Sequence, residues 1–186
     1  MHGRTAYRRH MPHYQNFGGT YLTTFVTRNR WTLPPAARTI ALMEIIEQHR
    51  KTAFIHTAVV MPDHVHIVLQ PLIDDAGWCY GLSRILRTIK GRSARFINIR
   101  LCRARHVWQE ESNDCELRRD ESVREKCEYV ARNPVRMGLA NSPDEYRWLW
   151  RWWVDDDGPA EARPTKGRWQ VARNRPTPAP PPARRD

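Results

Sequence analysis

Two short apolar runs separated by one Pro-Asp pair limit how this chain can fold more than any other feature of its sequence. The runs cover residues 54–61 and 65–69, and residues 62–63 form the break between them. Apolar segments of this length, bounded by turn residues, predict two strands. Because the connection is so tight, the two strands are expected to be antiparallel neighbours. A third strand is predicted over residues 19–27, which are rich in β-branched and aromatic side chains.

Helical patterns alternate with these strands. The apolar spacing after Pro34-Pro35 predicts a helix that continues to about Arg50. A second helix is predicted to begin at an N-cap Ser83 and to extend toward Phe96, although Gly91 within it argues against one unbroken helix. Helices packed against an antiparallel sheet form an α+β sandwich, which is the architecture that we expect.

The segment that follows is polar and ends in a third helical pattern. Residues 110–120 are predicted to form a loop or a short irregular helix. Ser122 and Glu125 form a capping box, which predicts the start of a helix. We expect that helix to run to about Asn133 and to stop there, because Pro134 disfavours helical backbone at the residue before it.

The composition changes near the C-terminus and predicts the domain organisation. Residues 163–186 contain seven cations, one carboxylate and six prolines. Such a segment cannot bury enough apolar surface to fold alone. We therefore expect one folded domain over residues 1–154 and a Pro- and Arg-rich, disordered tail over residues 155–186.

Charge and cysteine content exclude several classes of protein. Lys and Arg total 31 against 20 Asp and Glu, and 27 of the 31 cations are Arg, which favours phosphate recognition. No apolar run is long enough to span a membrane and the N-terminus lacks a signal-peptide core, so neither a membrane protein nor a secreted one is expected. The four cysteines form no CxxC pair and predict neither a zinc site nor a disulfide framework.

Two histidines, His64 and His66, lie at the head of the second predicted strand. Side chains alternate along a strand, so both imidazoles are expected on one face and Val65 on the other. Such a pair suits metal binding, although two surface histidines on the polar face of a half-buried strand would give the same pattern. A His-triad nucleotide hydrolase is excluded, because Val68 stands where that class requires a third histidine.

Tyr129 and Asn133 form a second candidate pair. They are four residues apart in the third predicted helix and so project from one face of it. The alternative is a tyrosine packed in the core and an asparagine that caps the helix. If instead the amide oxygen completes a metal site begun by His64 and His66, the bound ion polarises a phosphate. A tyrosine, whose ordinary pKa is about 10, needs such activation in order to attack, and the resulting phosphotyrosine suits strand transfer.

A basic stretch without a single Asp or Glu extends from Ala76 to Gln109. Its cations recur at helical spacing and are expected to form a stripe that binds nucleic-acid phosphates. The candidate DNA-binding residues are Arg84, Arg87, Lys90, Arg92 and Arg95.

Two other segments leave alternatives open. The N-terminal cations, followed by Tyr14 and Phe17, form either a basic arm with stacking groups or a flexible terminus. The tryptophans near position 150 either stack on unpaired bases or pack against the sheet or a partner chain, and packing is the favoured role.

In combination, these motifs resemble one known family. Met61-Pro-Asp-His-Val-His-Ile-Val-Leu69, the segment 82–98 and Glu128-Tyr-Val-Ala-Arg-Asn-Pro-Val-Arg-Met-Gly-Leu139 are similar to the REP-associated tyrosine transposases, which are single-tyrosine members of the HUH nuclease superfamily. The resemblance covers about residues 12–150 and implies a ferredoxin-like antiparallel sheet flanked by helices. The chain departs from its relatives after Trp108-Gln109, where the usual aromatic residue and Asp-His are missing.

The same resemblance implies a substrate, a cofactor and roles for the site residues. The substrate would be single-stranded or hairpin DNA from repetitive extragenic palindromes, cleaved to leave a 5′-phosphotyrosine and a free 3′-hydroxyl. Tyr129 would be the nucleophile, and His64, His66 and Asn133 would bind Mg²⁺ or Mn²⁺. Lys90 matches a position at which the family usually has a cation that faces DNA. A monomeric or homodimeric enzyme of the bacterial cytoplasm, associated with the nucleoid, is expected.

Two rival functions remain open at this point. One is a protein derived from such a transposase that binds structured DNA or RNA without cutting it. Such a protein would not need all four of the residues His64, His66, Tyr129 and Asn133. The other is a metal-dependent nuclease that uses water, in which Tyr129 is structural.

Overall fold

The computed structural model describes residues 18–118 and 122–155, and five strands in this part of the chain form one antiparallel sheet in the order β4-β1-β3-β2-β5. The strands are β1 Tyr21–Thr27, β2 Ala53–Val60, β3 His64–Pro71, β4 Trp108–Glu116 and β5 Leu149–Arg151. The helices are α1 Pro35–Ile46, α2 Leu82–Arg100, α3 Val123–Ala131, α4 Asn133–Arg136 and α5 Trp152–Asp155, with short 3-10 turns at Arg28–Arg30 and Pro143–Glu145.

The order of these elements confirms the expected fold. The chain runs β1-α1-β2-β3-α2-β4, and these strands lie in the spatial order β4-β1-β3-β2, which is the ferredoxin-like arrangement. Strand β5 extends the sheet beyond β2. The predicted hairpin is β2–β3, in which Val60 pairs with Val65 and the Met61 N–H donates to the His64 carbonyl across the turn.

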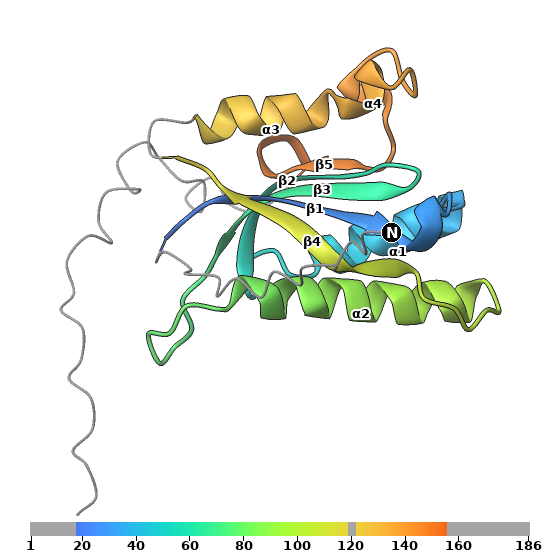
Figure 1. The fold of residues 1–186 in the computed structure, drawn as a ribbon. Coiled ribbons are helices and arrows are strands. Elements are labelled where there is room, and N and C mark those ends of the chain that lie inside the picture. The colour runs from blue at the N-terminus through green and yellow to red at the C-terminus, as the bar shows by residue number, and fades with distance from the viewer. Residues whose placement is uncertain (1–17, 119–121, 156–186) are drawn as a thin grey trace, which may run out of the picture.

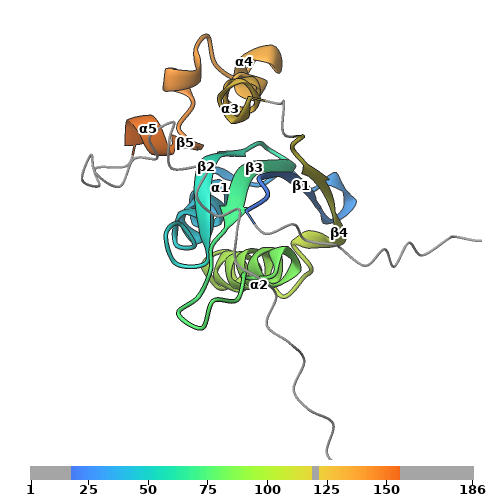
Figure 2. The ribbon, with the colours of Figure 1, turned by 90° about the vertical axis from the view of Figure 1, so that its left-hand side faces the viewer.

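The sheet separates two layers of helices. Helices α1 and α2 cover one face, and α3 covers the other (Figures 1 and 2). Residues of β3 alternate between the two layers. Val65, Ile67 and Leu69 belong to the main core with α1 and α2, whereas Val68 packs in a second core with Cys127 and Val130 of α3. Since His64 and His66 share the parity of Val68, both face the α3 layer.

The prediction of a loop or irregular helix over residues 110–120 is wrong, because residues 108–116 form the edge strand β4. The side chains of β4 are mostly exposed, so the hydrophobic pattern carried no strand signal. Backbone pairing with β1 holds the strand in the sheet, and its first residue, Trp108, pairs with Thr27. The Trp108 ring packs edge-on against Phe25 with centroids 4.9 Å apart, and its Nε1 donates to the buried Ser93 hydroxyl at 2.9 Å.

Two helix boundaries also differ from expectation, because α1 ends at Ile46 instead of near Arg50, and the N-cap of α2 is Gly81 instead of Ser83. Helix α2 continues through Gly91, which is exposed, because Ile85, Ile89 and Ile97 pack into the main core along its whole length. The predicted N-cap Ser122 is confirmed, since its hydroxyl accepts a hydrogen bond from the Glu125 N–H at 3.3 Å.

The third predicted helix is broken near its end. Helix α3 ends at Ala131, and Pro134 lies in the first turn of the separate helix α4 instead of stopping the helical path. Proline is tolerated in a first turn, where its missing N–H would have no helical partner.

The other sequence predictions have different outcomes. Trp150 is buried in the main core, and the Arg38 guanidinium lies 3.7 Å from the Trp148 ring centroid, so packing is confirmed for these two side chains. No cysteine of the described residues is in a disulfide. The N-terminal cations and the predicted tail beyond Asp155 lie outside the described residues. Within residues 18–118 and 122–155, no helix is long and apolar enough to cross a membrane.

Candidate active site

His64 and His66 lie side by side on β3, with ring centroids 4.8 Å apart. One ring nitrogen of each is already engaged. His64 Nδ1 is 2.6 Å from Asp63 Oδ1, and His66 Nδ1 is 2.8 Å from Thr24 Oγ1. Among the described residues neither Nε2 has a hydrogen-bond partner. Histidines that bind a metal through one nitrogen generally have the other held in this way, and in this pair both Nε2 atoms are left available.

Asp63 is itself fixed in place. Arg30 Nη1 donates to Asp63 Oδ2 at 3.1 Å, and the Thr27 N–H and hydroxyl both donate to the Asp63 carbonyl. Burial alone would raise the pKa of the Asp63 carboxyl, but the hydrogen bonds from His64 and Arg30 outweigh burial and lower that pKa. The carboxylate therefore stays ionised and accepts the Nδ1 proton of His64.

His66 is held in its neutral form. Burial lowers its pKa to about 4, and the nearby positive charges of His64 and Arg136 act in the same direction. A neutral imidazole is the form that binds a metal ion.

Tyr129 and Asn133 differ sharply in burial. Tyr129 is 52% exposed, so the alternative of a core tyrosine is wrong. Asn133 is buried, and its Nδ2 donates to the Val130 carbonyl at 3.1 Å, which satisfies one carbonyl at the end of α3. The helix-capping role and a ligand role are therefore compatible, because within the described residues Asn133 Oδ1 accepts no hydrogen bond.

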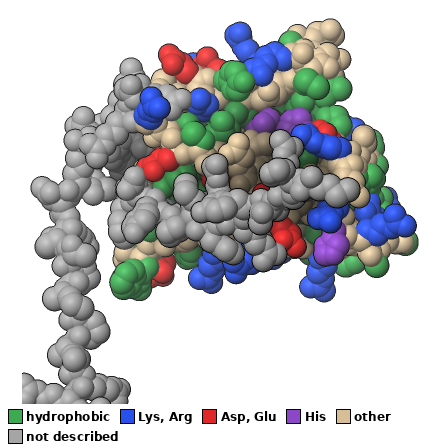
Figure 3. Space-filling view, in the orientation of Figure 1, with side chains coloured by type: hydrophobic (Ala, Val, Ile, Leu, Met, Phe, Trp, Pro, Cys, Tyr) green, Lys and Arg blue, Asp and Glu red, His purple; other side chains and the backbone are tan. Residues whose placement is uncertain are grey.

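Arg136, which the sequence did not single out, connects the tyrosine to the histidines. Its Nη2 donates to the Tyr129 hydroxyl oxygen at 3.0 Å, and its Cζ lies 4.2 Å from the Tyr129 ring centroid. Its charge also lowers the pKa of His66. Arg136 follows Tyr129 by two helical turns, and that spacing is the signal that could have revealed it. On the face of the molecule shown in Figure 3, histidine side chains reach the surface below the α3–α4 layer, next to basic side chains.

The donor atoms of this site suit a divalent cation. In the described part of the chain, no group of three or more His, Cys, Asp and Glu side chains could hold a metal. A cation at His64 and His66 would therefore need a different third ligand, and Asn133 has a carbonyl oxygen with no other hydrogen bond. Two imidazole nitrogens and one amide oxygen leave coordination positions open, and Mn²⁺ or Mg²⁺ accepts such oxygen-containing sites.

Comparison with known proteins decides the family. The family model of IS200-like transposases matches residues 17–133, which is more than half of the chain. The chain belongs to the IS200-like transposase family. This confirms the resemblance to tyrosine transposases at the level of the family. No curated protein matches the sequence.

One solved transposase structure has a related fold. A REP-associated tyrosine transposase bound to a REP hairpin superposes with a TM-score of 0.60 at 24% sequence identity, covering 78% of this chain and 82% of that one. A protein from Deinococcus radiodurans R1, also described as a transposase, gives a TM-score of 0.42 at 19% identity, covering 66% and 95% of the two chains. The first match shows that this IS200-like transposase has the fold of a REP-associated tyrosine transposase.

The basic helix α2 lies on the face of the sheet opposite α3 (Figures 1 and 2), whereas the histidines of this family member face α3. Arg84, Arg87 and Arg95 are exposed on α2, as the stripe prediction requires. A nucleic-acid strand that contacts both α2 and the histidines would therefore have to pass around an edge of the sheet.

The other two predicted DNA-binding cations have partners within the protein. Lys90 is half-buried, its Nζ donates to the Glu110 carbonyl at 2.8 Å, and burial lowers its pKa. Arg92 Nε is 2.6 Å from Glu44 Oε2 on α1. Both cations are thus less available to a ligand than the three exposed arginines.

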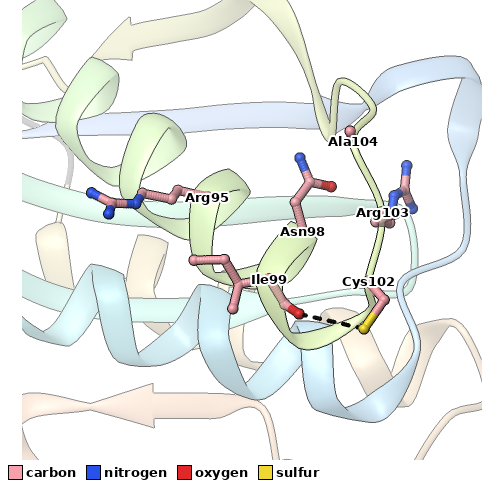
Figure 4. A pocket seen from close by; sticks show the side chains of 6 residues that line it. All are labelled: Arg95, Asn98, Ile99, Cys102, Arg103 and Ala104. Atoms are coloured by element: carbon pink, nitrogen blue, oxygen red, sulfur yellow. Dashed lines mark hydrogen bonds between the residues drawn. The ribbon is translucent and has the colours of Figure 1, made fainter.

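A groove of about 1300 Å³ separates α2 from β4. Cations of α2, including Arg87 and Arg95, line one side, and carboxylates of β4, including Glu111, line the other. A smaller pocket lies at the end of α2 (Figure 4), where Asn98 Nδ2 donates to the Arg105 carbonyl at 2.9 Å. The Arg103 guanidinium beside it lies 3.7 Å from the Trp31 ring centroid.

Proposed function

We propose that this chain nicks and rejoins single-stranded DNA through a covalent bond to Tyr129. The observation that carries the proposal is an exposed phenol, held by Arg136, on the same side of the sheet as two oriented imidazoles. Membership of the transposase family supports it. The solved REP-associated relative is bound to a REP hairpin, and we propose hairpin-containing repeats as the substrate here.

The proposed reaction is a transesterification. The Tyr129 oxygen attacks the scissile phosphorus and loses its proton to solvent, while the bond from phosphorus to the 3′-oxygen breaks. That 3′-oxygen leaves with the bonding electrons and takes up a proton. The phosphotyrosine keeps the energy of the phosphodiester, so a free 3′-hydroxyl can reverse the step and join a new strand.

His64, His66 and Asn133 are the proposed ligands of Mg²⁺ or Mn²⁺. A divalent cation, when bound, polarises the scissile phosphate and neutralises its charge. Asp63 and Thr24 hold the two Nδ1 atoms and so keep both Nε2 atoms available. The Asn133 amide is oriented by its bond to Val130.

The exposed cations of α2 are the proposed contacts to the DNA backbone. Arg84, Arg87 and Arg95 lie on the opposite side of the sheet from Tyr129. Because Arg87 and Arg95 line the groove between α2 and the edge strand β4, we infer that bound DNA passes this edge to reach the site. Phosphate contacts of this kind position the strand and do not read its sequence. We assign this activity to a domain of residues 1–154, followed by the tail of residues 155–186.

The proposal is tested by incubating the full chain with labelled hairpin DNA and Mn²⁺ and resolving it on a denaturing protein gel. A labelled protein band is expected for the wild type and for the matched control Tyr80→Phe. The band should be absent for Tyr129→Phe and in the presence of EDTA, while Tyr129→Phe still binds DNA. Cleaved DNA without a labelled band would mean a water nucleophile, and binding without either product would mean a binding protein. Either result would overturn the proposal.

A further inference from the structure

Arg136 fixes the direction of the Tyr129 phenol by two contacts. One guanidinium nitrogen donates to the hydroxyl oxygen at 3.0 Å, and the guanidinium carbon lies 4.2 Å from the ring centroid. The Tyr129 side chain is otherwise 52% exposed at the end of α3. An exposed tyrosine without such contacts would rotate freely, so Arg136 determines where the attacking oxygen points.

The positive charge of Arg136 is not neutralised by the described part of the protein. Arg92 and Arg124 form ion pairs with Glu44 and Glu128, but within the described residues no carboxylate pairs with Arg136. An uncompensated guanidinium beside a candidate nucleophile is suited to bind an anion there.

The position of Arg136 is set by the short helix α4. Its N–H donates to the Arg132 carbonyl at 3.0 Å, which keeps it in register with the end of α3. Pro134 and the buried Asn133 occupy the first turn of the same helix. The proposed metal ligand Asn133 and the guanidinium are therefore carried by one rigid four-residue unit.

We propose that Arg136 is a catalytic residue, which holds the attacking oxygen of Tyr129 and then binds a non-bridging oxygen of the phosphate as the tyrosyl–phosphorus bond forms. This inference rests on the proposed function. The phenol proton goes to solvent, the bond between phosphorus and the 3′-oxygen breaks, and that oxygen leaves with the electron pair and gains a proton. Negative charge moves from the phenolic oxygen to the phosphate in this step. A planar guanidinium with five N–H donors can stabilise the charge at both positions.

The test compares Arg136→Gln and Arg136→Lys with Arg132→Gln, an exposed arginine at the end of α3 that serves as the matched control. Single-turnover formation of the covalent adduct is measured with saturating hairpin DNA and Mn²⁺. Loss of a preorganised donor to a developing charge costs about 100-fold or more in rate, so Arg136→Gln is expected to slow adduct formation by about that factor. Arg136→Lys keeps the positive charge but lacks the planar set of N–H donors of a guanidinium. Its rate of adduct formation should therefore lie between those of the wild type and Arg136→Gln. Arg132→Gln should react at the wild-type rate.

Chemical rescue separates a catalytic role from a structural one. Added guanidinium ion should restore part of the rate of Arg136→Ala, while thermal unfolding and Mn²⁺ binding remain at wild-type levels. Wild-type rates in Arg136→Gln, or a slow Arg136→Ala that guanidinium does not rescue, would overturn the inference and leave the proposed function intact. A wild-type chain that forms no adduct would overturn the proposed function itself.

Discussion

Thr24 Oγ1 lies 2.8 Å from Nδ1 of His66, and the two residues are register partners on the central strands β1 and β3. The orientation of one candidate metal ligand is therefore fixed by strand pairing. A shift of one residue in this register would move Thr24 to the opposite face of the sheet. The fold thus determines which nitrogen of His66 is available.

Thr24→Val is expected to weaken metal binding without unfolding the protein. Valine has nearly the shape of threonine but cannot bond to His66, so the imidazole loses its orientation. Loss of a partner that orients a metal ligand typically costs about 10- to 100-fold in metal affinity. Mn²⁺ titration by calorimetry measures the effect, and Thr24→Ser, which keeps the hydroxyl, is the control. Equal Mn²⁺ affinity in Thr24→Val and the wild type would contradict this role.

Removing an exposed cation of α2 should reduce both DNA affinity and its salt dependence. Arg87 is exposed, whereas Arg92 is already paired with Glu44. Each lost phosphate contact lowers the slope of log K against log salt by about 0.7 for a single strand. Arg87→Gln is expected to show that change and Arg92→Gln a clearly smaller one, measured by fluorescence anisotropy over a KCl series. Equal effects would mean that both cations contact DNA.

The stability of the fold should fall at acidic pH because of His56. Its side chain is buried beside Phe54, and burial, followed by the charge of His49, lowers its pKa to about 3. The ordinary pKa of about 6.5 applies to the unfolded chain, so between these values the unfolded state binds one more proton than the folded state. The free energy of unfolding is therefore highest above pH 6.5 and falls as pH decreases, by at most about 1.4 kcal/mol per pH unit for this group.

Urea unfolding at neutral and at mildly acidic pH tests this expectation. His56→Leu should show a weaker pH dependence than the wild type, because it removes one of the groups that bind a proton only on unfolding. His106→Gln, at an exposed position, is the matched control. Identical pH dependence in the wild type and His56→Leu would show that His56 is not held neutral.

Sequence reasoning located β2 and β3, whose side chains are mostly buried. The runs that became β2 and β3 are nearly continuous in apolar residues, and their tight connection allows little but a hairpin. Strand β4 was not predicted from the sequence, because its side chains, such as Glu111 and Asn113, are polar and exposed. Backbone hydrogen bonds hold this edge strand, and they leave no hydrophobic pattern in the sequence.

The same distinction applies to the candidate site. That His64 and His66 share a face follows from strand periodicity, and the structure confirms this placement. Thr24 could not be assigned to His66 from sequence, because their contact depends on the β1–β3 register over a long separation. The metal-binding and catalytic roles of these residues stay predictions.

The most direct test of the central claim is to identify the residue that carries the DNA. The covalent adduct is digested with nuclease and trypsin, and the peptides are analysed by mass spectrometry. Cleavage after Lys126 and Arg132 gives a peptide that contains Tyr129 as its single tyrosine. The account predicts a nucleotide mass added to Tyr129 in that peptide. A nucleotide on any other residue, or no modified peptide from a chain that has cleaved its DNA, would contradict it.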